Sequence, residues 1–208
     1  MLTERKDIAY LDSHMDGPGR VYRHEFFRDR MERIPLYAWE RYDLEPYEAL
    51  IIPNNIDEEW LYPRRERIAE FMASGRILVS FAQPFLPWLP GGVLWRQSPL
   101  GIQERTVLAH EEHPIFQGVT EYDLNYRRGV KGFFSRGYFE APQQAEIVLR
   151  DNAGAVVVYI DRLTTNGTIL AGAGTDLLGY GLSDTTTARR IGLQLVAWID
   201  SERKGRGR

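Results

Sequence analysis

The sequence predicts an α/β protein whose mostly parallel β-sheet has helices on both faces. Two observations support this prediction. Short apolar runs alternate with segments of helical periodicity through residue 81. Further along, three apolar runs separated by turn sequences precede a final amphipathic segment. We therefore expect a β-α-β core, a C-terminal β-meander that extends its sheet, and a closing helix.

The N-terminal segment predicts two strands joined by a helix. Residues 7–11 (DIAYL) form an apolar run that ends at Asp12, as expected of a short buried strand. Three apolar residues then share helical spacing, namely Phe27, Met31 and Ile34. We expect this helix to end at Pro35, because proline cannot continue the hydrogen-bond ladder. Residues 36–39 are then predicted to form a second strand.

The next segment predicts a strand, a divided helix and another strand. Residues 47–52 (YEALII) read as a buried strand, and Asn54 and Asn55 as the turn that follows it. Acidic residues then begin a helical segment, as is favourable at a helix N-terminus. We expect Pro63 to divide it into a short lead-in turn and a main helix. Residues 77–81 predict the next strand.

The remainder of the chain divides into an insert, a meander and a helix. Pro, Gly and aromatic residues dominate residues 86–138, which predicts an irregular insert with short strands. Turn sequences separate three apolar runs within residues 145–179, as in a β-meander. Residues 185–201 have the pattern of an amphipathic helix. We expect residues 1–201 to form a single domain and residues 202–208 a basic, flexible tail.

Composition narrows the classes of function. The net charge of -3 gives no bulk attraction to nucleic acid or to an anionic membrane, so we expect neither as a partner. The chain has no cysteine, which excludes disulfides, Cys-ligated metals and thiol catalysis. No apolar run approaches ~18 residues, and the N-terminus lacks the apolar region of a signal peptide. These features predict a cytoplasmic protein.

Three segments, in this order, resemble the class I glutamine amidotransferase-like superfamily. The stretch YEALIIPNNIDEEWLYPRRERIAEFMASGRILVSF, residues 47–81, is similar to its strand–turn–helix–strand unit. HPIFQGV, residues 113–119, is similar to a His-Pro-Ile…Gly segment, and GTILAGAGTDLLGYG, residues 167–181, to the penultimate strand and Gly-rich turn. The nearest branches are the trehalose-utilisation (ThuA-like) family and the trimerisation domains of some β-galactosidases.

The resemblance implies a flavodoxin-like, three-layer fold without the glutaminase chemistry of the superfamily. Its glutaminases carry a cysteine nucleophile in the turn where this chain has Ala82. They also use a His-x-Glu pair near the C-terminus, whereas no histidine follows Tyr180 here. Asn54 and Asn55 replace the paired glycines of the family. Glutamine hydrolysis through a thioester is therefore unavailable to this chain.

The candidate residues for a catalytic or ligand-binding site are polar residues that follow the predicted strands. In open α/β sheets, ligands bind beyond the carboxyl ends of the strands. We expect Asp12 and His14 to be catalytic if the protein is an enzyme, through acid–base chemistry or a metal. The expected ligand-binding residues are Asn54, Asn55, Gln83 and Asp176. The alternative is that Asp12 caps a turn and His14 is a solvated loop residue. The sequence supports no specific metal site or cofactor.

Two further patterns have a structural explanation. The sequence HEEH, residues 110–113, places His and Glu together, but Pro114 follows at once and no helix can hold it. A turn with a packed His113 explains it better than a metal site. The insert is rich in aromatic residues, which suit a homo-oligomer contact or the mouth of the crevice. The residues expected there are Trp88, Trp95, Phe133 and Phe134. Alternatively, the insert packs on its own sheet.

The sequence thus leaves three classes of function. The leading one is a ThuA-like protein that binds a small polar ligand, related to carbohydrate, without glutaminase activity. The second is a cysteine-free hydrolase or isomerase that uses Asp12 and His14, with or without a metal. The third is an interaction or oligomerisation subunit whose insert packs on a partner.

Overall fold

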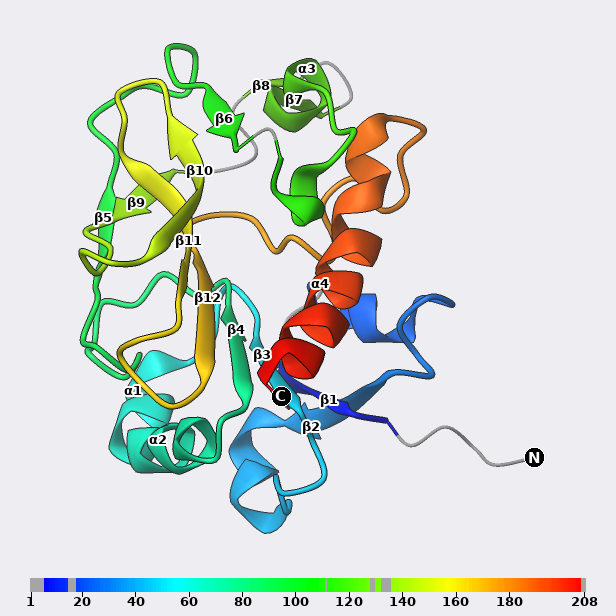
Figure 1. Cartoon of the computed structure of the whole chain (residues 1–208), viewed down its shortest axis with the longest axis vertical. Helices are drawn as coiled ribbons and strands as arrows, with labels where there is room; N and C mark the ends of the chain where they lie inside the picture. The colour runs from blue at the N-terminus through cyan, green and yellow to red at the C-terminus, as the bar shows by residue number, and fades with distance from the viewer. Residues whose placement is uncertain (1–5, 15–17, 111, 128–129, 132–135, 207–208) are drawn as a thin grey trace.

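The computed structural model describes residues 6–14, 18–110, 112–127, 130–131 and 136–206 and shows an α/β fold around a large mixed sheet (Figure 1). One half of the sheet is parallel, but the sheet as a whole is mixed and not mostly parallel as predicted, because every pairing beyond β12 is antiparallel. Its strands, in spatial order, are β2 (Met31–Pro35), β1 (Ile8–Asp12), β3 (Ala49–Ile52), β4 (Ile77–Ser80) and β12 (Thr168–Gly172).

The other half of the sheet is antiparallel and contains the predicted meander. β12 is followed in space by β11 (Val156–Asp161), β10 (Glu146–Asp151) and the edge strand β6 (Val107–Ala109). Two strands of the insert pair with each other beside β11, namely β5 (Trp95–Gln97) and β9 (Gly137–Phe139). Strands β7 (Tyr126–Arg127) and β8 (Val130–Lys131) form a separate small ribbon.

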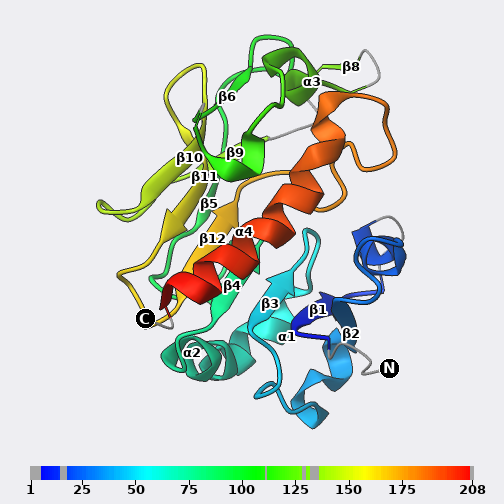
Figure 2. The same cartoon turned by 45° about the vertical axis from the view of Figure 1, so that its right-hand side comes forward.

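Helices cover both faces of the parallel half (Figure 2). On one face lies α4 (Arg190–Arg206), and on the other lie α1 (Glu58–Leu61) and α2 (Arg65–Ala73). The strands alternate between the two cores: Val79 belongs to the core that contains Leu195 of α4, and Leu78 to the core that contains Met72 of α2. The short helix α3 (Glu121–Asn125) belongs to the insert. Because α4 runs to Arg206, residues 202–206 are helical and not a flexible tail as predicted.

The helix predicted from Phe27, Met31 and Ile34 is wrong. The chain instead forms a 3-10 helix over Pro18–Arg23, then turns, and then strand β2. Met31 and Ile34 are buried because β2 pairs in parallel with β1, while the residues between them are only partly buried. Spacings of three and four residues indicated a helical stripe, but pairing with β1 overrides this local pattern.

The strand predicted over residues 36–39 is also wrong, because Leu36–Arg41 form a 3-10 helix. Leu36 and Trp39 are both fully buried. A spacing of three residues brings two side chains to the same side of a 3-10 helix, so one short turn buries both. By contrast, Pro63 divides the segment between β3 and β4 as predicted, with a 3-10 turn (Tyr62–Arg64) between α1 and α2.

The insert packs partly on its own chain. Trp88 is only 2% exposed, and the half-buried Trp95 donates its indole N–H to the carbonyl of Ala173 at 2.8 Å. The prediction places Trp88 near a subunit contact or at the mouth of the crevice, whereas its ring is already covered within the chain. Phe133 and Phe134 lie outside the described residues. The homo-oligomer itself stays a prediction.

The helices of the described part of the chain are all too short or too polar to cross a membrane.

Candidate functional site

The predicted site residues follow strands that end at one edge of the sheet. β1, β3, β4 and β12 are parallel neighbours, so their carboxyl ends lie side by side. Asp12 ends β1, and the other residues lie in the segments that follow β3, β4 and β12, namely Asn54, Asn55, Gln83 and Asp176. This edge is where open α/β sheets bind ligands.

Asp12 is engaged in a turn and an ion pair. Its side chain is buried, its Oδ1 accepts the backbone N–H of His14 at 2.9 Å, and its Oδ2 forms a short ion pair with Arg33. His14 has a φ of 61°, in the left-handed region that suits such a turn. The turn-capping role weighed from the sequence is therefore what Asp12 performs here.

Arg33 also contacts His14, with 2.6 Å between Nη2 and the imidazole Nδ1. A guanidinium can only donate, so Nδ1 accepts and the proton of the neutral ring is on Nε2. His14 is exposed to solvent. Arg33 could not be predicted from the sequence, because only the pairing of β1 with β2 brings it beside Asp12.

Asp176 lies in the segment after β12, close to Tyr10 of β1. Its Oδ1 accepts the backbone N–H of Leu178 at 2.8 Å. Burial raises the pKa of Asp176 to about 6, although the backbone N–H groups of Leu178 and Gly179 and the Tyr10 hydroxyl oppose this effect. Burial, followed by the charges of Asp176 and Asp12, raises the pKa of Tyr10. Tyr10 is therefore subject to the charges of both carboxylates at this edge.

We expect Asp176→Asn to change how stability depends on pH. The folded chain holds a proton on Asp176 between pH ~4 and ~6 that the unfolded chain releases, so ionisation of this carboxyl costs stability as the pH rises. Asparagine cannot ionise and keeps an oxygen for Leu178. Urea unfolding measures the free energy of unfolding of both proteins. The difference, variant minus wild type, should be about 2 kcal/mol larger at pH 8 than at pH 4. A constant difference would contradict the assignment.

The turn after β4 contains Ala82 and Gln83 and follows a strand flanked by β3 and β12. Ala82 is buried and Gln83 is exposed. Glu58, the first residue of α1, reaches into this turn: its Oε2 accepts the backbone N–H groups of Phe85 at 3.0 Å and Leu86 at 3.2 Å. Glu58 is 4% exposed, and burial raises its pKa against the effect of these donors. The two N–H groups are thus occupied by the chain's own carboxylate.

The start of α1 also holds the segment after β2. Asp57 caps the helix by accepting the N–H of Trp60 at 2.9 Å, and its other oxygen accepts the Tyr37 hydroxyl at 2.9 Å. Asn55, two residues earlier, is exposed with a φ of 58°. Asp57 therefore binds the segment after β2, and the next residue, Glu58, binds the segment after β4. The two segments lie on either side of the turn after β3. We call Tyr37, Asn55, Gln83 and Phe85 the α1 corner.

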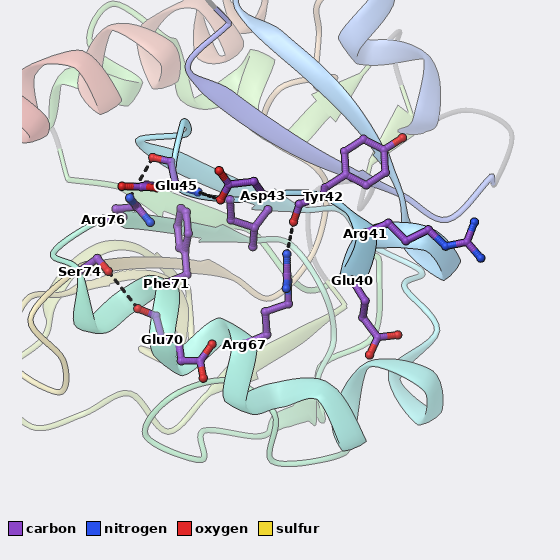
Figure 3. A pocket seen from close by; sticks show the side chains of 11 residues that line it. Glu40, Arg41, Tyr42, Asp43, Glu45, Arg67, Glu70, Phe71, Ser74 and Arg76 are labelled. Carbon is purple, nitrogen blue, oxygen red and sulfur yellow. Dashed lines mark hydrogen bonds between the residues drawn. The ribbon is translucent and has the colours of Figure 1, made fainter.

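A pocket of about 410 Å³ lies near the amino ends of β3 and β4, between residues 40–45 and α2 (Figure 3). Arg67 donates to the carbonyl of Tyr42, and Arg76 donates to the carbonyl of Glu45 at 2.9 Å. These bonds hold residues 40–45 against α2. The lining contains none of the predicted site residues, and the guanidinium groups of Arg67 and Arg76 donate hydrogen bonds to the loop 40–45.

His113 is packed, as the structural explanation of the HEEH sequence predicted. It is 5% exposed, and its Nδ1 accepts the N–H of Ile115 at 3.3 Å at the start of a 3-10 helix. Burial lowers the pKa of His113, although Glu146 lies 3.6 Å from its Nε2. The structure describes no cluster of three or more acidic or His side chains that could hold a metal, within the residues that it places.

Known proteins share the fold at low sequence identity. A cytoplasmic protein from Salmonella typhimurium LT2 superposes over 94% of this chain and 98% of its own, with a TM-score of 0.63 and 11% identity. Exo-beta-1,4-mannosidase Op5Man5 from Opitutaceae bacterium strain TAV5 matches 93% of this chain with 35% of its own (TM-score 0.54, 16% identity). A glutamine amidotransferase from Methylobacillus flagellatus matches 93% of this chain with 89% of its own (TM-score 0.47, 12% identity).

No family model matches the sequence, and no curated protein matches it in sequence comparison. The similarities to the Salmonella protein and to the mannosidase are between folds, at identities of 11% and 16%. They define an α/β architecture that spans nearly the whole chain, and the function has to be argued from the site.

Proposed function

We propose that this chain is a member of the class I glutamine amidotransferase-like superfamily, close to its ThuA-like branch, with a flavodoxin-like sheet. In this proposal it lacks glutaminase activity and binds a small polar ligand, related to carbohydrate, at the carboxyl edge of the parallel strands. The observation that carries the proposal is the turn after β4. Ala82 stands where the superfamily has its nucleophile, and Glu58 accepts hydrogen bonds from the neighbouring backbone N–H groups of Phe85 and Leu86.

The residues at this edge favour binding over catalysis. Both oxygens of Asp12 already accept hydrogen bonds, from His14 and Arg33, so this carboxylate is a poor candidate for a general base. Asn55 and Gln83 are exposed instead. An amide both donates and accepts hydrogen bonds without a charge, which suits hydroxyl groups on a ligand. The hydrolase alternative would need the Asp12–Arg33 ion pair to open.

Two comparisons guide the choice of ligand and compartment. A domain of this fold forms about a third of the chain of an exo-mannosidase, which makes saccharides the first ligands to test. The similar Salmonella protein is cytoplasmic, and we propose the same compartment for this chain.

The binding proposal is tested by titrating the purified protein with mannobiose, lactose, maltose and trehalose in a calorimeter. We expect one or more of them to bind, and Gln83→Ala to weaken that binding at least about fivefold, because one lost hydrogen bond is worth about 1 kcal/mol. Gln144→Ala is the control, since Gln144 is an exposed glutamine in the loop before β10. We also expect no ammonia release from glutamine. Absence of saccharide binding, or measurable glutaminase activity, would contradict the proposal.

A further inference from the structure

We infer that Tyr37 and Phe85 form the stacking surface of a site for a neutral saccharide at the α1 corner. This inference rests on the proposed function and names the residues and ligand class that serve it. Tyr37 is 56% exposed and Phe85 is 62% exposed. Both lie in segments that follow parallel strands at the ligand-binding edge. Flat apolar rings that remain exposed at such an edge are suited to the apolar faces of a sugar ring.

The Tyr37 ring and the backbone at Phe85 are held in place before any ligand arrives. The backbone N–H of Phe85 donates to the buried Glu58 carboxylate. The Tyr37 hydroxyl donates to Asp57, and its ring packs edge-on against Trp60, with 5.5 Å between centroids and 86° between planes. A fixed aromatic side chain loses little conformational entropy when a ligand stacks on it.

Uncharged polar groups lie in the same segments as the rings. Gln83 is exposed two residues before Phe85, and Asn55 is exposed two residues before Asp57, the partner of Tyr37. The positive φ of Asn55 fixes the turn that presents its side chain. Aromatic faces combined with amide donors and acceptors match the alternating apolar and hydroxyl surfaces of a sugar.

Charges around the corner favour a neutral sugar over a phosphorylated one. The nearby guanidinium of Arg64 lies 3.8 Å from the Trp60 ring centre and donates to Glu40 and to the Trp60 carbonyl, at 2.9 Å each. Arg33, farther along the edge, is paired with Asp12. Asp57 adds a negative charge that would repel phosphate.

The experiment compares saccharide binding to three single variants with binding to the wild type. Phe85→Ala and Tyr37→Ala each remove one ring of the proposed surface. Tyr122→Ala is the matched control, because Tyr122 is 64% exposed but lies on α3 of the insert. Calorimetry with the tightest-binding of the four saccharides should give affinities at least about fivefold lower for the first two variants and unchanged for the control. Circular dichroism melting checks that each variant is folded.

The outcomes separate this inference from the proposal on which it rests. If the wild type binds a saccharide and Gln83→Ala weakens it, but neither ring variant does, the stacking surface is refuted while the edge site stands. If Tyr122→Ala weakens binding as much as the other two, the assignment to the α1 corner is wrong. If no saccharide binds to the wild type, both the proposed function and this inference fail. Tyr37→Phe, which keeps the ring, should bind better than Tyr37→Ala.

Discussion

Glu58→Ala should lower the free energy of unfolding by about 3 kcal/mol or more. Its carboxylate is buried and accepts two backbone N–H groups, from Phe85 and Leu86. Alanine leaves both donors without this acceptor and opens a void at the start of α1. Urea unfolding at pH 7 measures the loss. Glu59→Ala is the control: the neighbouring glutamate is exposed, and its loss should change stability by less than about 0.5 kcal/mol.

A small carboxylate should partly replace the missing side chain. Acetate can occupy the space left by Glu58→Ala and accept the same two N–H groups, so it should raise the melting temperature of this variant more than that of Glu59→Ala or the wild type. Chloride at equal ionic strength corrects for general salt effects. Equal stabilisation of all three proteins by acetate would show that acetate does not take the place of the Glu58 carboxylate.

The strands of the parallel half could be predicted from the sequence because their apolar runs are continuous and short. β1, β3 and β4 are buried on both faces, so Asp12 and Ser80 stand only at strand ends and do not obscure the pattern. The break at Pro63 could also be predicted, since it follows from the covalent structure of proline. β2 could not, because it is an edge strand whose partly buried Glu32 and Arg33 interrupt its apolar positions.

The placement of the candidate residues at one edge of the sheet could be predicted from the sequence, but their contacts could not. The rule that parallel strands end at one edge was enough to place Asp12, Gln83 and Asp176 there. The partners that decide their chemistry are distant in sequence: Arg33 lies 21 residues from Asp12, and Glu58 lies 27 residues from Phe85. An acidic residue at a helix start also has a local explanation in the helix dipole, which concealed the tertiary role of Glu58.

The largest loss of stability is expected from breaking the buried ion pair between Arg105 and Asp151. Their side chains are 4% and 1% exposed, with 2.9 Å between Nε and Oδ2. Arg105 also donates to the carbonyl of Gly137 at 2.7 Å. Through these bonds Arg105, which lies within the insert, is joined both to Asp151 of β10 and to Gly137 near the end of the insert, so the pair holds the insert on its own sheet.

We expect Asp151→Ala to cost about 3 to 5 kcal/mol, because it leaves a buried guanidinium without its counter-charge. It also removes the oxygen that accepts the N–H groups of Ala153 at 3.0 Å and Ala155 at 2.8 Å in the turn after β10. The exposed pair Arg96–Glu140, 3.9 Å apart, is the control, and Glu140→Ala should cost less than about 1 kcal/mol.

A double variant separates the charge from the packing. Arg105→Met with Asp151→Leu removes both charges and fills part of their volume, so its loss should be smaller than the sum of the losses from Arg105→Met and Asp151→Leu alone. Urea unfolding of all three proteins gives the coupling energy. Additive losses would mean that the two side chains act independently, and that other contacts hold the insert on the sheet.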